Sequence, residues 1–134
     1  MSITREQKSA LVKAAIEASE YAYIPYSKYK VGAAILTESG EIFKGCNVEN
    51  ASYPIGVCAE RTAVVKAVSE GKKNMIACAV VTRDGGSPCG MCRQTLNEFN
   101  PKMHIILAKL DGEIMHEMPL NELLPLGFGP ENLL

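Results

Sequence analysis

The apolar run NMIACAVVT occupies residues 74–82 and contains no charged side chain. An uninterrupted run of this length suits a strand that is buried on both faces of a sheet. A strand of that kind needs helices above and below it. We therefore expect a layered α/β fold with residues 74–82 in the middle of the sheet.

The chain before this run predicts a helix, a hairpin and a second helix. Residues 5–23 carry apolar side chains at helical spacing, and Pro25 ends that helix. Residues 31–37 and 41–48 predict the two strands of a hairpin around a tight turn. The stretch CAERTAVVKAVSEG, residues 58–71, then predicts a helix that its final glycine closes.

The chain after this run predicts one more helix and two short strands. Ser87 is suited to cap a helix that runs to about Phe99, with a proline at its first position. Strands are expected at residues 103–108 and 112–116, followed by a helical turn at 120–124. This order predicts a three-layer α/β/α fold whose mixed five-stranded sheet is covered by helices on both faces.

The bulk composition is that of an ordinary globular protein. The chain has 134 residues, of which 47% are hydrophobic and 22% charged, and we expect a single domain over residues 1–134. A net charge of −1 provides no basic face for nucleic acid. We find no signal peptide, no lipidation motif and no apolar run near the roughly 20 residues that span a bilayer. We therefore expect a soluble cytoplasmic protein with no membrane or nucleic-acid partner.

Five cysteines stand at positions 46, 58, 78, 89 and 92. An odd number in a reducing compartment argues against a disulfide scaffold. In SPCGMCRQ, residues 87–94, Cys89 and Cys92 are compatible with a disulfide, a redox switch or half of a metal site. Metal binding or catalysis is the favoured interpretation of cysteines that cluster in this way.

Cys58 opens one predicted helix, and Cys89 and Cys92 open another. A helix N-terminus stabilises thiolate, the form that binds metal, so three thiols from two helix starts predict a zinc site. The alternative for Cys58 is a buried cysteine with no ligand role. A structural zinc would need a fourth protein ligand, and the candidates (Cys46, Cys78, His104 and His116) lie at no ligand spacing. A site with three ligands keeps a position open and is typical of catalysis.

Glu60 lies two residues after Cys58, close enough to reach over a metal without binding it. A carboxylate in that position can move protons between water and a substrate. The alternative is that Glu60 simply stabilises a helix N-terminus, as acidic residues commonly do.

The pattern C-A-E at residues 58–60, followed by P-C-x-x-C at 88–92, resembles the zinc-dependent nucleobase deaminases. The chain is most similar to one family among them, the small homotetrameric cytidine deaminases. The segments that carry the resemblance are PYSKYKVGAA at 25–34, GCNVENASYPIGVCAERTA at 45–63, SPCGMCRQTLNEF at 87–99 and ELLPLGFGPENL at 122–133. They cover most of the chain from Pro25 onward.

This resemblance implies zinc-dependent hydrolytic deamination of cytidine and 2′-deoxycytidine to uridine, 2′-deoxyuridine and ammonia, in pyrimidine salvage. It implies one Zn²⁺ per subunit, with Glu60 as the catalytic proton carrier and the Ala59 backbone near the base. A zinc ion with three thiolates carries about one negative charge. Arg61 is therefore expected to donate hydrogen bonds to the sulfurs, although a solvent-exposed helical arginine is the alternative.

Asn47 and Glu49 flank Val48 where the second strand ends, so strand periodicity places both polar side chains on one side. The resemblance implies that they hold the ribose hydroxyls, whereas polar residues also end strands without binding anything. Tyr29 matches the family position that stacks on the pyrimidine, which is usually phenylalanine. Tyr53 and Phe128 match pocket positions, and Phe128 is expected from a neighbouring subunit of a homotetramer with shared sites.

Three rival functions remain at this point. A blasticidin-type deaminase would share the zinc motifs but lack the ribose pair of N47VEN50. Deamination of bases within RNA or DNA is disfavoured because no basic patch is visible. A redox or structural-zinc protein would explain C-G-M-C but leaves Glu60 and the ribose pair without a role.

Overall fold

The structure, a computed structural model, describes residues 3–134, so the first two residues of the predicted domain lie outside the described residues. Five strands form one sheet in the order β2-β1-β3-β4-β5. Their bounds are β1 Gly32–Thr37, β2 Ile42–Cys46, β3 Met75–Thr82, β4 His104–Lys109 and β5 Ile114–Pro119. The apolar run at 74–82 thus supplies the central strand, as the sequence predicts.

The sheet is mixed, which confirms the predicted fold class. Strand β1 runs antiparallel to both β2 and β3, β4 runs parallel to β3, and β5 is antiparallel to β4. A parallel pair needs a crossover connection, and helix α3 (Gly90–Phe99) supplies it between β3 and β4. The crossover begins at the carboxyl end of β3, the edge at which open α/β sheets commonly bind ligands.

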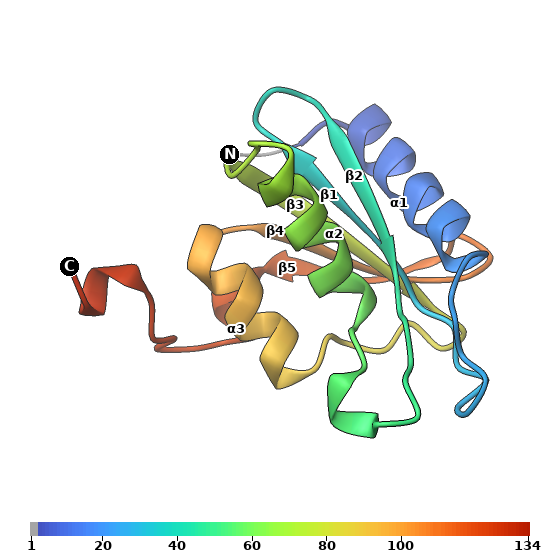
Figure 1. Ribbon diagram of the computed structural model, residues 1–134. Helices are drawn as coiled ribbons and strands as arrows, with labels where there is room; N and C mark the ends of the chain where they lie inside the picture. The colour runs from blue at the N-terminus through green and yellow to red at the C-terminus, as the bar shows by residue number, and fades with distance from the viewer. Residues whose placement is uncertain (1–2) are drawn as a thin grey trace.

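Three helices cover the sheet on its two faces (Figure 1). Helix α1 (Arg5–Ser19) lies on one face, and α2 (Ala59–Ser69) and α3 lie on the other. Successive residues of β1 face the two layers in turn: Ala34 and Leu36 pack in the core beneath α1, and Ala33 and Ile35 pack in the core beneath α2 and α3. This alternation follows from strand geometry and accounts for the burial of every residue of β1.

The N-terminal half of α2 lies close to β2 because residue 45 is glycine. A Cβ atom at Gly45 would collide with the backbone nitrogen of Ala63 and lie 2.6 Å from the carbonyl oxygen of Ala59. A larger residue would push the helix away from the sheet. The glycine therefore fixes the height at which the start of α2, with Cys58 and Glu60, stands above the sheet.

The first helix is shorter than predicted. It ends at Ser19 rather than near residue 23. Tyr23 instead pairs with the chain after β2: its amide donates to Asn47 O at 3.0 Å, and its carbonyl accepts from Glu49 N at 2.8 Å. Backbone pairing with a distant segment replaces the last helical turn, and it anchors the segment that carries both predicted sugar-binding residues.

The start of α3 also differs from the sequence prediction. Cys89, rather than Ser87, is the N-cap, and Gly90 is the first helical residue. The Ser87 hydroxyl is engaged elsewhere, because it accepts a hydrogen bond from Arg93 Nη2 at 2.9 Å. The predicted turn after β5 is present as a short 3₁₀ helix, Leu120–Glu122. Within residues 3–134, no helix combines the length and apolar character needed to cross a membrane.

Candidate metal centre and active site

Three cysteine side chains meet where α2 and α3 begin. Cys58 caps α2, Cys89 caps α3, and Cys92 lies in the first turn of α3. The Cys58 and Cys89 sulfurs are 3.8 Å apart, and those of Cys89 and Cys92 are 3.6 Å apart. All three sulfurs lie within 4.8 Å of one another. The structure therefore brings together the three thiols that the sequence predicts.

This spacing fits a tetrahedral zinc ion. With Zn–S bonds of about 2.3 Å, tetrahedral geometry separates the sulfurs by about 3.8 Å. None of the four other candidate ligands joins the group within residues 3–134. Cys78 is fully buried in the core, and His104 Nε2 lies 2.8 Å from Glu117 Oε1. The described residues thus provide three clustered thiols that could hold a tetrahedral ion, and no fourth histidine, cysteine or carboxylate of residues 3–134 joins them.

The pKa values of two of the thiols are shifted in opposite directions. The hydrogen bond from Cys92, together with the guanidinium of Arg61, lowers the pKa of Cys58 to about 5. The same bond to Cys58, together with burial, raises the pKa of Cys92. In the metal-free protein the hydrogen bond between the two thiols and the positive charge of Arg61 therefore favour a thiolate at this group. A thiolate already present at the group favours capture of a soft cation.

Arg61 lies on the first turns of α2 and points toward this group. Its Nη2 atom is 4.0 Å from Cys58 Sγ and donates to Gly56 O at 3.2 Å. The Nε atom is buried and has no hydrogen-bond partner among the described residues. A half-buried guanidinium whose Nε donor is unused is suited to stabilising negative charge on neighbouring sulfurs.

Glu60 is buried beside the thiols, with 4% of its surface exposed. Burial raises its pKa from 4.5 to about 7, and the negative charge of Cys58 acts in the same direction. A carboxyl group with a pKa near neutrality can both accept and donate a proton at physiological pH.

A cavity of about 300 Å³ opens in front of the thiols, and we name it the thiol cavity. It combines most of the predicted site residues: Tyr29, Asn47, Glu49, Cys58, Ala59, Glu60 and Cys89. Its remaining walls include Thr82 at the end of β3 and Gly86, Ser87 and Pro88 of the following loop. Residues from four distant parts of the chain therefore face one space.

Asn47 and Glu49 both line the thiol cavity, as their spacing predicts. The Asn47 side-chain amide makes two hydrogen bonds to the backbone of residues 29–31. It accepts from Val31 N at 3.0 Å and donates to Tyr29 O at 2.8 Å. Glu49 Oε1 accepts from the backbone amides of Tyr26 and Ser27, each at 3.1 Å. Hydrogen bonding from Ser27 lowers the pKa of Glu49, so the group is a carboxylate at neutral pH.

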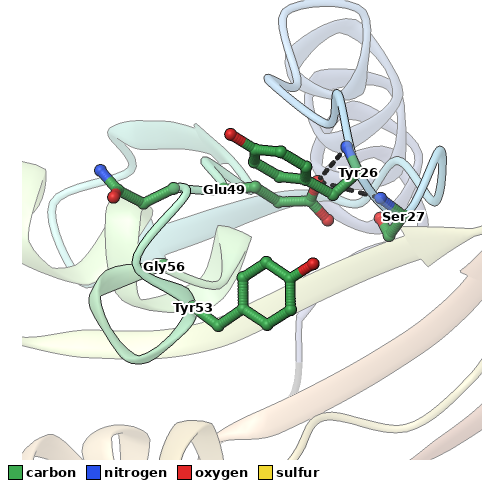
Figure 2. Close-up of a pocket in the computed structure, with 6 residues that line it drawn as sticks. Tyr26, Ser27, Glu49, Tyr53 and Gly56 are labelled. Carbon is green, nitrogen blue, oxygen red and sulfur yellow. Dashed lines mark hydrogen bonds between the residues drawn. The ribbon is translucent and has the colours of Figure 1, made fainter.

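A second cavity, of about 350 Å³, adjoins the first and shares Ser27 and Glu49 with it. Figure 2 shows the Glu49 carboxylate beside the Tyr26 and Ser27 amides, with the Tyr53 ring on the opposite wall. The Tyr26 and Tyr53 ring centroids are 5.8 Å apart. Tyr53 is 76% exposed, and it lines this second cavity but not the thiol cavity.

Phe128 lies away from the thiol cavity of its own chain. It is 56% exposed, and its carbonyl oxygen accepts from Gln94 Nε2 at 2.8 Å and Asn97 Nδ2 at 3.1 Å, both on α3. In Figure 1 the C-terminal segment leads outward past α3, away from the sheet. The structure thus does not bring Phe128 together with the other predicted site residues.

We did not identify from the sequence two residues whose side chains hold the surroundings of the thiol cavity in place. Arg93 donates to Pro88 O, Leu123 O and Ser87 Oγ at 2.8, 2.8 and 2.9 Å, and so ties the loop before Cys89 to the C-terminal segment. Asp84 accepts the Tyr29 hydroxyl at 2.8 Å. Arg93 directly follows Cys92, which gives a sequence signal, whereas nothing in the sequence around Asp84 indicates its partner.

The chain has clear relatives among known proteins. Residues 5–108 match the family described as the cytidine and deoxycytidylate deaminase zinc-binding region. A cytidine deaminase of Halalkalibacterium halodurans is 46% identical over 129 residues, covering 94% of this chain and 97% of the relative. One from Sporosarcina psychrophila is 48% identical over 126 residues, covering 92% of each.

A solved structure agrees with these matches. The crystal structure of cytidine deaminase from Burkholderia pseudomallei superposes with a TM-score of 0.85 at 43% identity, covering 94% of this chain and all of that one. The family is a zinc-binding one, which agrees with the three-thiol group. The chain belongs to the cytidine and deoxycytidylate deaminase family.

Proposed function

We propose that this chain catalyses the hydrolytic deamination of cytidine and 2′-deoxycytidine to uridine and 2′-deoxyuridine, with release of ammonia. The observation that carries the proposal is the thiol cavity, where a three-cysteine group, the buried carboxyl of Glu60 and the carboxylate of Glu49 face one space. Family membership and the relatives named cytidine deaminase support it.

We assign one zinc ion per chain to Cys58, Cys89 and Cys92. Bound zinc supplies Lewis acidity, which lowers the pKa of water and makes it a nucleophile near neutral pH. Three thiolates outweigh the two charges of the ion, and the excess would weaken that effect. Arg61, 4.0 Å from Cys58 Sγ, offsets it by placing a fixed positive charge beside the sulfurs.

Glu60 is assigned the proton transfers. The reaction adds water at C4 of the pyrimidine and expels the amino group, so one proton must reach ring nitrogen N3 and another must reach the departing nitrogen. Both protons come from the water, and a single carboxyl can carry them in turn. Burial raises the pKa of Glu60 to about 7, which suits a group that alternately accepts and donates.

We place the sugar at Glu49 and Asn47 and the base between Tyr29 and the Ala59 backbone. One Glu49 oxygen already accepts two backbone amides, which hold the carboxylate in one orientation and leave its other oxygen to accept from a hydroxyl. The aromatic ring of Tyr29 lines the same cavity and offers a stacking surface. Free nucleosides, rather than nucleic acids, fit a chain with a net charge of −1.

We further propose a homotetramer in which Phe128 and Tyr53 complete the sites, with Phe128 reaching a neighbouring subunit. An exposed aromatic ring on a segment that leads away from its own cavity has little of its own chain to cover it. The described cysteines are all free thiols, which suits the reducing cytoplasm, and we place the reaction in pyrimidine salvage there.

The test is a direct assay on the purified, zinc-loaded chain. Loss of the cytidine absorbance band, with release of one ammonia per uridine formed, is the expected result for cytidine and for deoxycytidine. A zinc-loaded, folded protein that turns over neither nucleoside would overturn the proposal. Blasticidin-type substrates serve as the comparison, because activity on them alone would identify the rival function.

A further inference from the structure

A side-chain hydrogen bond joins the wall of the thiol cavity to the loop that delivers Cys89. The Tyr29 hydroxyl donates to Asp84 Oδ1 at 2.8 Å, across a sequence separation of 55 residues. Asp84 lies between the end of β3 and the N-cap of α3, in a segment with no helix or strand of its own. The hydrogen bond therefore connects the segment before β1 with the loop between β3 and α3, which leads to Cys89.

Asp84 also organises its own loop. Its Oδ1 atom accepts from the Thr82 hydroxyl at 3.0 Å and from Gly86 N at 3.2 Å. Thr82 Oγ1 in turn accepts from Gly86 N at 2.9 Å. Gly85 adopts a φ of +73°, a conformation that side-chain-bearing residues rarely take. Two consecutive glycines would leave this loop with many conformations, and these hydrogen bonds restrict it to one.

The ring of Tyr29 is fixed from a second side. The Arg83 guanidinium carbon lies 4.8 Å from the ring centroid, within cation–π distance. Tyr29, Thr82 and Gly86 line the thiol cavity, whereas Arg83 does not. Arg83 thus covers one face of the Tyr29 ring, and Asp84 holds the hydroxyl at the edge of the ring.

Both partners stay in the protonation states that the bond requires. Burial raises the pKa of Tyr29, so its hydroxyl remains a donor. The hydrogen bond from Tyr29 lowers the pKa of Asp84, which remains a carboxylate at neutral pH. The hydrogen bond between Tyr29 and Asp84 therefore persists at pH values near neutrality.

We propose that Tyr29, acting through Asp84, is a positioning residue that holds the β3–α3 loop, and with it Cys89, at a fixed place relative to the cavity wall. Phenylalanine at this position would keep a stacking ring and lose the connection. The part that concerns nucleoside binding rests on the proposed function, whereas the part that concerns the metal group does not.

The test compares Tyr29→Phe with Tyr21→Phe, a matched removal of one hydroxyl from a ring that is 81% exposed. Zinc release into excess chelator is expected to accelerate about two- to tenfold in Tyr29→Phe, the range for a partly exposed hydrogen bond, with a similar rise in KM for cytidine. The control should match the wild type. Zinc release and KM both unchanged in Tyr29→Phe would overturn the proposal.

A double-mutant cycle isolates the bond. Tyr29→Phe should have no further effect on zinc release in an Asp84→Ala background, because the acceptor is already gone. Asp84→Asn, whose amide oxygen still accepts a hydrogen bond, should release zinc at a rate between those of Asp84→Ala and the wild type. A Tyr29→Phe effect that persists in full without the Asp84 carboxylate would contradict the mechanism.

Amide hydrogen exchange adds a readout on the single variant, independent of whether Asp84→Ala folds. The Gly86 amide should exchange faster in Tyr29→Phe than in Tyr21→Phe, and equal protection would count against the proposal. Zinc release and amide exchange need no substrate. A chain inactive on nucleosides would therefore overturn the proposed function alone.

Discussion

Glu60→Gln removes the buried carboxyl beside the thiols and leaves an amide of nearly the same size. Since Glu60 is not one of the three clustered ligands, the variant should bind zinc as the wild type does. It cannot carry protons, so kcat for cytidine should fall by at least about 10²- to 10⁴-fold, the usual contribution of a general acid–base group. Glu70→Gln, an exposed position at the end of the same helix, is the matched control.

The same variant has a predictable effect on stability. Burial raises the pKa of Glu60 from 4.5 to about 7 in the folded, metal-free chain. The folded state therefore binds this proton more tightly than the unfolded state, and the stability it contributes is present below pH 4.5 and lost as the pH rises through about 7. At 1.36 kcal/mol per pH unit, the full loss is about 3 kcal/mol.

Glutamine does not titrate, so metal-free Glu60→Gln should gain stability over the wild type as the pH rises. Between pH 5 and pH 8 the difference in unfolding free energy should grow by about 2.5 kcal/mol. Denaturant unfolding of both proteins under reducing conditions measures it. Near-normal turnover by the zinc-loaded variant would refute the catalytic role, and a difference independent of pH would refute the argument from burial.

Further outcomes are expected at the ligands, the sugar site and the C-terminal segment. Cys58→Ala should lower the zinc content measured by atomic absorption, whereas Cys46→Ala, outside the thiol group, should not; full occupancy in the first variant would contradict the ligand set. Glu49→Ala should raise KM for cytidine about tenfold or more with zinc unchanged, because a ribose hydroxyl loses a charged partner, and an unaltered KM would remove the sugar assignment. Mixed tetramers of Glu60→Ala and Phe128→Ala chains should be more active than either variant alone if Phe128 acts in a neighbouring subunit. No gain, despite a clear defect in Phe128→Ala, would exclude the shared site.

The layers of the fold were predictable because single strong signals specify them. The uncharged run at 74–82 favours a strand buried on both sides, and the helices that cover it follow from that burial. The end of α1 was not predictable from local pattern. Residues after Ser19 keep a helical spacing, and only backbone pairing of Tyr23 with Asn47 and Glu49, far along the chain, draws them out of the helix.

In the candidate site, too, some residues were predictable from the sequence and others were not. Cys58, Cys89 and Glu60 could be predicted because helix starts and short spacings bring their chemistry together locally. The partnership of Tyr29 with Asp84 depends on the path of a glycine-containing loop, which residue spacing does not encode. The cap of α3 was misplaced for a related reason: the Ser87 hydroxyl bonds to a side chain one turn into the helix and not to a backbone amide.

Anomalous X-ray scattering at the zinc edge, from crystals of the zinc-loaded protein soaked with a non-reactive cytidine analogue, would locate the metal and the nucleoside in one experiment. We expect one zinc peak per chain, about 2.3 Å from the sulfurs of Cys58, Cys89 and Cys92, with the sugar of the analogue at Glu49 and its base in the thiol cavity. A zinc ion bound by other side chains, or an analogue bound outside this cavity, would contradict this expectation.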